Sequence, residues 1–160
     1  MEDTKARIIA EIGKRPGSRY RELIRATGLA NSTFAIHIVE LQKLDKIKVQ
    51  KKNRATRFYP ASTPDRECTI FACICQQTAA RLIWFMLEND NSSFKEIVKA
   101  VGKSPSTISH HLTRLKKNDI VTERYWSTGK TYSIIDKDEI SSIIEKYRLL
   151  PAQKTWLYFP

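Results

Sequence analysis

The chain has 160 residues, of which 41% are hydrophobic, and it contains five glycines and six prolines. This composition is typical of a globular protein rather than a disordered one, and the length suits one ordinary domain or two small ones. The formal net charge of +11 favours a polyanionic partner, because a small protein this basic repels itself when it folds.

The apolar segments give no sign of membrane insertion. The longest runs, "IFACIC" and "LIWFML", are too short to cross a bilayer. The first residues, "MEDTKARIIAEIG", carry acids before a short apolar stretch, which is unlike a signal peptide. We therefore expect a cytoplasmic protein with no membrane partner.

An internal repeat of 53 residues organises the chain. Residues 81–133 align with residues 7–59 without a gap, and twelve of the 53 aligned pairs are identical. Two copies of this length predict two small domains of one kind rather than a solenoid, which needs more repeats. The identical pairs include Glu22/Glu96, Gly28/Gly102, Ser32/Ser106, Thr33/Thr107, His37/His111 and Leu41/Leu115.

The first copy predicts three helices followed by a β-hairpin. Pro16 and Gly17 form a turn after the first helix, and Gly28 follows the second helix, where glycine stops a helix at least cost. Two β-prone runs then flank a two-residue turn. The expected helices and strands cover residues 4–14, 20–27, 31–44, 47–52 and 55–59.

The second copy predicts the same order of elements. Ser93 and Glu96 form a capping box before its second helix, and Gly102 follows that helix. Ser104 caps the third helix, whose first position is Pro105. The expected helices and strands cover residues 78–90, 94–101, 105–115, 119–126 and 130–135.

Three helices with a glycine between the last two, followed by a two-stranded wing, resemble the winged helix-turn-helix. The arrangement resembles the tandem winged helix-turn-helix transcription regulators of archaea, and each unit is similar to ArsR- and MarR-type domains. The resemblance covers about residues 4–135 and implies a mostly α fold with small β-hairpin wings (α+β). The implied domains are a first winged helix-turn-helix unit (1–63), a second with a connecting helix (64–135), and a C-terminal amphipathic helix with an aromatic tail (136–160).

This resemblance implies sequence-selective binding of double-stranded DNA by a transcription regulator associated with the nucleoid. Recognition helices would enter the major groove and basic wings would grip the backbone. No enzyme and no cofactor are expected, because the sequence shows no phosphate-cradling glycine loop, metal constellation or nucleophile–base signature. Two alternatives stay open: a winged-helix protein-interaction module of transcription or replication machinery, and an RNA-binding protein.

The third helix of the second copy carries the candidates for sequence reading. Ile108, Leu112 and Leu115 share one face, which leaves short polar side chains on the other. Ser109 and His110 are the candidates for base contacts. The other candidates for DNA contact in this copy are Lys103, Ser104, Ser106, Thr107, Thr113, Arg114, Lys116, Lys117, Arg124 and Lys130.

Structural alternatives stay open for some of these residues. Ser106 and Thr107, like the aligned Ser32 and Thr33, also suit a role as helix caps only. His111 is expected to be a half-buried packing residue.

The first copy differs at the reading positions. Ala35 and Ile36 replace Ser109 and His110, so this helix either touches thymine methyl groups or faces a protein partner. Ser32 and Thr33 remain candidates for DNA contact.

The first hairpin is instead strongly basic. Residues 1–63 hold fourteen lysines and arginines against six acids, a balance of +8, to which Arg15, Arg19, Arg21 and Arg25 also contribute. A charge run is often only a solvated face. In a wing, however, it favours contact with phosphates, so we expect unit one to supply affinity and unit two more of the sequence reading. The candidates are Lys48, Lys51, Lys52, Arg54 and Arg57.

Three cysteines, Cys68, Cys73 and Cys75, lie between the two copies. Their odd number indicates a reducing compartment rather than a disulfide framework. We expect them to pack as small hydrophobes. Arsenic-sensor relatives bind thiophilic metals through closely spaced cysteines, so metal or redox sensing is the alternative.

The last segment predicts an amphipathic helix with Ile140, Ile143, Ile144 and Tyr147 on one stripe. Pro151 is expected to end it, and the tail "TWLYFP" adds four consecutive apolar residues. The resemblance implies a homodimer through this helix and the middle segment (residues 69–87), which is expected to form one or two buried helices. Packing of the tail within its own chain is the alternative.

Overall fold

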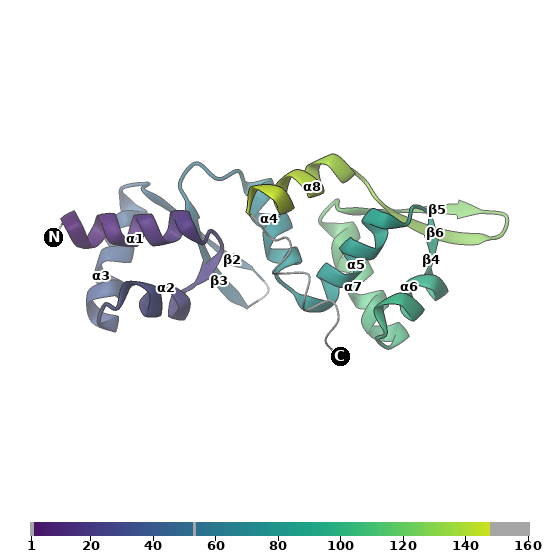
Figure 1. The fold of residues 1–160 in the computed structure, drawn as a ribbon, viewed down its shortest axis with the longest axis horizontal. Helices are drawn as coiled ribbons and strands as arrows, with labels where there is room; N and C mark the ends of the chain where they lie inside the picture. Colours follow the sequence, from purple (N-terminus) through teal and green to yellow (C-terminus); the bar gives the residue numbers. More distant parts are fainter. Residues whose placement is uncertain (1, 53, 148–160) are drawn as a thin grey trace. The chain divides into compact units, whose positions relative to one another are not determined.

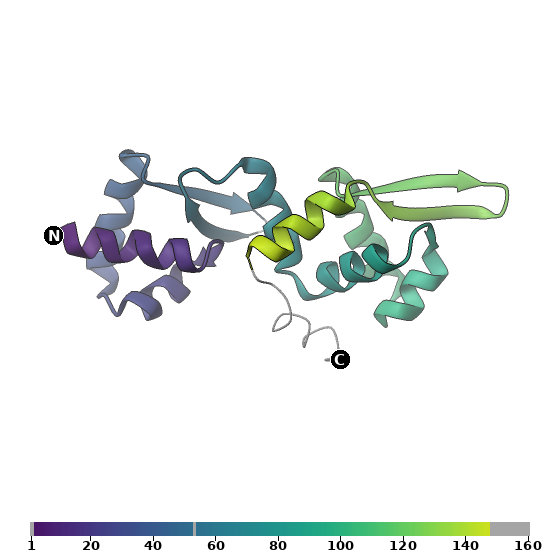
Figure 2. The ribbon, with the colours of Figure 1, turned by 45° about the horizontal axis from the view of Figure 1, so that its top comes forward.

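The computed structural model describes residues 2–52 and 54–147 (Figures 1 and 2). The chain divides into two compact units, of which unit 1 ends at Cys68 and unit 2 begins at Thr69. The described residues form eight helices and two small antiparallel sheets, an α+β architecture consistent with a winged helix-turn-helix.

Unit 1 consists of three helices and a three-stranded sheet with the order β1-β3-β2. Gly28 ends the second helix in the left-handed conformation (φ 69°), and its N–H donates to the carbonyl of Ile24. This stop lets the chain turn at once into the third helix. The elements are α1 (Glu2–Lys14), β1 (Ser18–Arg19), α2 (Tyr20–Thr27), α3 (Asn31–Lys43), β2 (Ile47–Lys52) and β3 (Ala55–Pro60).

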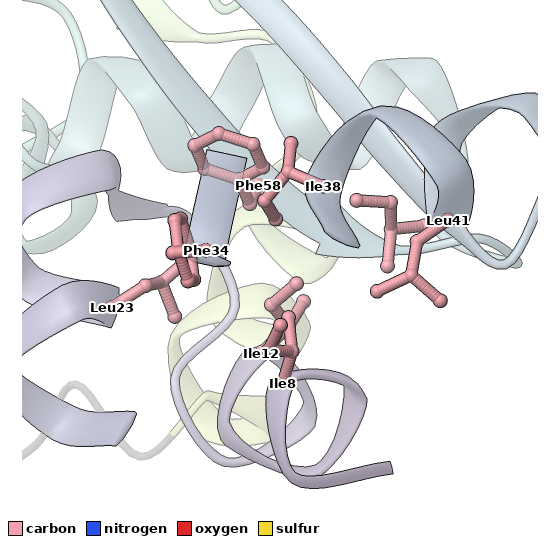
Figure 3. Close-up of a cluster of buried hydrophobic side chains, with 8 residues drawn as sticks. Ile8, Ile12, Leu23, Phe34, Ile38, Leu41 and Phe58 are labelled. Atoms are coloured by element: carbon pink, nitrogen blue, oxygen red, sulfur yellow. The ribbon is translucent and has the colours of Figure 1, made fainter. Parts of the chain in front are cut away.

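The core of unit 1 gathers apolar side chains from all three helices and the hairpin (Figure 3). Phe34 of α3 is fully buried, and the ring of Tyr20 meets it edge-on at 4.9 Å between centroids. The other members on α1 and α3 follow the three-to-four-residue spacing of amphipathic helices, and the rest come from α2 and the strands. They are Ile8, Ile12, Leu23, Ile38, Leu41, Ile47 and Phe58.

Unit 2 contains a similar order of elements and a sheet with the order β4-β6-β5. Its β5–β6 hairpin projects away from the helices (Figures 1 and 2). The elements are α5 (Gln77–Glu88), β4 (Ser92–Ser93), α6 (Phe94–Val101), α7 (Pro105–Lys117), β5 (Val121–Trp126), β6 (Gly129–Ile134) and α8 (Lys137–Lys146).

The sequence did not predict the two-residue strands β1 and β4. Each lies directly before the second helix of its unit and pairs with the returning strand of the hairpin, Ser18 with Phe58 and Ser92 with Tyr132. Both serines are buried and donate from Oγ to a carbonyl three residues earlier, at 2.6 Å and 2.9 Å. The shared Ser18/Ser92 pair in the repeat is therefore explained by one buried turn in each unit.

The middle segment (residues 69–87) contains parts of two helices, α4 (Asp65–Ile74) and α5. The first of them, α4, begins four residues before this segment. Among the described residues, no single helix is both long and apolar enough to cross a membrane, although α4 and α5 meet that test as a pair bent by 102°.

The apolar face predicted for the last helix packs against other residues of the same chain. Ile140, Ile143 and Ile144 of α8 are buried, and Tyr147 meets the ring of Phe71 at 5.1 Å. Pro151 and the aromatic tail lie outside the described residues, so the expectations about them stay predictions.

Alanine substitutions at two glycines test whether the backbone conformation or a lack of space requires glycine. A Cβ added at Gly28 or at Gly13 would meet no atom within 4 Å, but only Gly28 has a positive φ. We expect Gly28→Ala to lower the free energy of unfolding by about 1 kcal/mol, because left-handed backbone disfavours a Cβ. Gly13→Ala, inside α1, should raise it by about 0.5 kcal/mol. Urea denaturation measures both, and changes of the same sign would contradict this explanation.

Candidate nucleic-acid interface

The third helix of unit 2, α7, presents the polar face that its sequence predicts. Ser104 caps the helix by accepting the N–H of Thr107 at 3.3 Å, and Pro105 takes the first position. Ile108, Leu112 and Leu115 are buried. The exposed candidates on this helix are Ser106, Ser109, His110, Thr113, Lys116 and Lys117, whereas Lys103, Thr107 and Arg114 are half-buried.

Two residues of α7 face their own unit. Arg114 donates from Nη1 to the Gln76 side chain at 3.1 Å, so its guanidinium is engaged before any ligand arrives. His111 is half-buried as expected, and its ring lies 5.6 Å from that of the exposed His110. Burial, with the charges of Arg114 and His110, lowers the pKa of His111.

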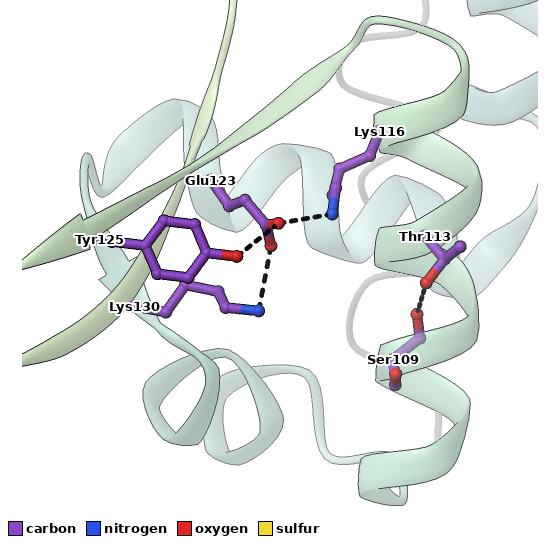
Figure 4. A network of polar contacts seen from close by, with 6 residues as sticks. All are labelled: Ser109, Thr113, Lys116, Glu123, Tyr125 and Lys130. Atoms are coloured by element: carbon purple, nitrogen blue, oxygen red, sulfur yellow. Dashed lines mark hydrogen bonds and ion pairs between the residues drawn. The ribbon is translucent and has the colours of Figure 1, made fainter.

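A carboxylate organises the space between α7 and the hairpin (Figure 4). Glu123 of β5 accepts from Lys116 Nζ at 2.7 Å, from the Tyr125 hydroxyl at 3.1 Å and from Lys130 Nζ at 3.2 Å. The hydrogen bond from Lys116, followed by those from Lys130 and Tyr125, holds the pKa of Glu123 below its usual value. Thr113 lines the same small groove and donates to the carbonyl of Ser109.

Glu123 was not among the residues predicted to form the site. Residues two apart on a strand share a face, so Glu123 and Tyr125 lie on one side of β5, whereas Arg124 between them is exposed on the other. The register then places Lys130 opposite Tyr125. Alternation along the strand would have indicated the Glu123–Tyr125 pair, but the contact with Lys116 depends on how α7 packs.

The equivalent helix of unit 1, α3, presents an apolar face. Ile36 is 61% exposed and Val39 is 51% exposed, at positions that align with His110 and Thr113. Ser32 is exposed and Thr33 half-buried, and neither caps the helix, because α3 follows Ala30. In unit 2 the cap is Ser104, and its hydroxyl also lies at hydrogen-bond distance from the hydroxyls of Ser106 (3.2 Å) and Thr107 (2.8 Å).

The five hairpin cations of unit 1 fall into two groups. Lys48 donates to Asp65 and to the carbonyl of Thr63, both at 2.6 Å, and the hydrogen bond to Asp65 raises its pKa. Arg57 donates to the Gly17 carbonyl at 2.7 Å. The three nearer the tip are Lys51 and Arg54, which are exposed, and Lys52, which is half-buried.

The cysteines mostly behave as core residues. Cys68 and Cys73 are buried, and Cys75 is exposed. Burial raises the pKa of the Cys68 thiol to about 11, so this group is protonated near neutral pH. Residues 2–52 and 54–147 contain no group of three or more His, Cys, Asp and Glu side chains arranged to hold a metal ion.

Comparisons with known proteins show similarity to transcription regulators. The family model described as "Bacterial regulatory protein, arsR family" matches residues 79–123. A relative from Methanocaldococcus jannaschii, described as an uncharacterized HTH-type transcriptional regulator, is 32% identical over 81 residues, which are 51% of this chain and 90% of the relative.

Two solved structures are similar at low sequence identity. HlyU from Vibrio cholerae has a TM-score of 0.46 and 19% identity, over 53% of this chain and 91% of its own. The winged helix-turn-helix DNA-binding domain of Mb0332 from Mycobacterium bovis, described as homodimeric, has a TM-score of 0.46 and 16% identity, over 62% and 97%.

The lowered pKa of His111 gives a pH dependence of stability. Because the folded protein binds this proton more weakly than the unfolded chain, the free energy of unfolding should fall as the pH drops below about 6.5, the usual histidine value. His111→Gln should make the fall between pH 7.5 and 5.5 shallower. Denaturant titrations across this range measure the slope, and an NMR titration reads the pKa directly. An unchanged slope, or a pKa at or above 6.5, would contradict the prediction.

Proposed function

The chain belongs to the HTH-type transcriptional regulators, and part of it matches the arsR family model. On that premise we propose that it binds double-stranded DNA through α7 and the two hairpins. In this proposal both units act as winged helix-turn-helix modules. The first turns of α7 enter the major groove, and the cations flanking them contact phosphates.

The polar face of α7 is the observation that carries this proposal. Ser109, His110 and Thr113 are exposed on the side opposite the buried stripe. Hydroxyl and imidazole groups can hydrogen-bond base edges in the major groove. The neighbouring cations Lys116 and Lys117 continue this face toward the end of the helix, where they suit phosphates. The remaining sequence candidates, Lys103, Ser104, Ser106, Thr107, Arg114 and Arg124, stay predictions.

Several finer expectations also remain proposals. They are an archaeal origin, the domain bounds 1–63, 64–135 and 136–160, and a homodimer through α8 and the middle segment. Since the apolar stripe of α8 is buried within one chain, such a dimer would use the other faces of this helix.

A second candidate function rests on the exposed Ile36 and Val39 of α3. An apolar face on a helix surface suits a protein partner, as in an interaction module of transcription or replication machinery.

Measuring affinity for duplex DNA, duplex RNA and single strands of equal length separates these functions. We expect duplex DNA to bind most tightly, because the deep major groove of A-form RNA excludes a helix. If duplex DNA binds no more tightly than duplex RNA or single strands, the proposal is overturned.

Replacing the reading residues should reduce specificity more than affinity. We expect Ser109→Ala/His110→Ala to weaken binding to a site selected from random DNA by about tenfold or more, and binding to random duplexes far less. Ile36→Ala, at the position aligned with His110, is the control in unit 1 and should leave the ratio of the two affinities nearly unchanged. Equal losses on both kinds of duplex would show that α7 does not read sequence.

The first hairpin should contribute without regard to sequence. Neutralising Lys51, Lys52 and Arg54 together should weaken binding to every duplex and reduce the slope of log affinity against log salt by about one per lost phosphate contact. Fluorescence anisotropy at several salt concentrations gives this slope. An unchanged slope would remove these three residues from the interface.

A further inference from the structure

A basic groove of unit 1 is lined by residues from the start of α2 and the hairpin tip, and by none of α3. A groove of about 450 Å³ runs between the start of α2 and the tip of the β2–β3 hairpin. Arg21 and Arg25 are four residues apart on α2 and therefore share a face of that helix. The groove is lined by Arg19, Tyr20, Arg21, Glu22, Arg25, Arg54, Ala55 and Thr56.

The charges in this arginine groove are poorly compensated. Glu22 is its one acidic lining residue, and its carboxylate accepts the backbone N–H of Arg19 at 3.2 Å. Within the described part of the chain, no carboxylate forms an ion pair with Arg21, Arg25 or Arg54. Other cations near the hairpins do form ion pairs, Lys48 with Asp65 and Lys116 and Lys130 with Glu123. Unpaired guanidinium groups that converge repel one another, so an external anion stabilises this arrangement.

Unit 2 provides an internal comparison. The gapless repeat aligns the four groove arginines, Arg19, Arg21, Arg25 and Arg54, with Ser93, Lys95, Lys99 and Thr128. Guanidinium groups are therefore concentrated in the unit whose α3 face is apolar. Arginine binds phosphate bidentately through a planar fork, whereas lysine offers a point charge.

We propose that the arginine groove binds the phosphodiester backbone of double-stranded DNA, so that unit 1 holds DNA through α2 and the hairpin tip rather than through α3. This inference rests on the proposed function and deepens it. The groove would supply affinity that does not depend on base sequence, because it contacts phosphates. Ile36 and Val39 would then not have to enter a major groove.

The test compares two variants with the same loss of charge. Arg21→Ala/Arg25→Ala removes two groove arginines that are exposed, so the fold should survive. Arg15→Ala/Lys46→Ala removes two exposed cations of unit 1 that do not line the groove. Binding of the full chain to one duplex is measured by anisotropy over a range of salt concentrations, and circular dichroism checks folding.

The groove variant should lose about tenfold or more in affinity and reduce the salt slope by about two, one for each phosphate contact. The charge-matched control should change the slope by less than half as much. Equal changes in both variants, or an unchanged slope in the groove variant, would overturn the inference while leaving the proposed function intact. Failure of the unaltered chain to bind duplex DNA would overturn both.

A free polyphosphate could offer the same chemistry to the groove. Calorimetric titration with tripolyphosphate distinguishes a free polyphosphate from the DNA backbone as the ligand of the groove. We expect weak binding that duplex DNA displaces. If Arg21→Ala/Arg25→Ala abolishes tripolyphosphate binding but keeps the salt slope on DNA, the groove is a small-anion site and the backbone assignment is wrong.

Discussion

In each unit a two-residue strand joins the start of the second helix to the hairpin. Pairing of Ser18 with Phe58, and of Ser92 with Tyr132, joins the residue before the second helix to the returning strand of the hairpin. In unit 1 the N–H of Gly17 also donates to the Phe58 carbonyl at 2.8 Å. Because the start of α2 is tied to its hairpin in this way, the tip of the β2–β3 hairpin and the start of α2 line one groove.

The basic residues of unit 1 differ in their contacts according to their position along the hairpin. Near the base of the hairpin, Lys48 and Arg57 bind groups of their own unit and stabilise the fold. Toward the tip, Arg54 instead meets the arginines of α2 in a groove. A single run of cations in the sequence therefore contains residues that bond to groups of their own unit and one, Arg54, that lines the groove.

The sequence predicted local features better than it predicted pairings. Glycine stops at Gly28 and Gly102, the cap at Ser104 and the buried stripe of α7 all depend on neighbours within a few residues, and each is present. Which cation meets which acid depends instead on strand register and helix packing. The contact of Lys116 with Glu123, and the approach of Arg54 to α2, therefore became visible only in the folded chain.

The Glu123 cluster has a kinetic consequence for a DNA-bound surface. Lys116 and Lys130 already share a carboxylate, so an arriving phosphate exchanges one anionic partner for another and never meets a bare ammonium group. On departure, the same carboxylate takes the lysines back. Such exchange reduces the net gain from each lysine–phosphate contact, because the ion pair with Glu123 is given up. Contacts at this hairpin would therefore be short-lived, which suits a protein that must scan and release many sites.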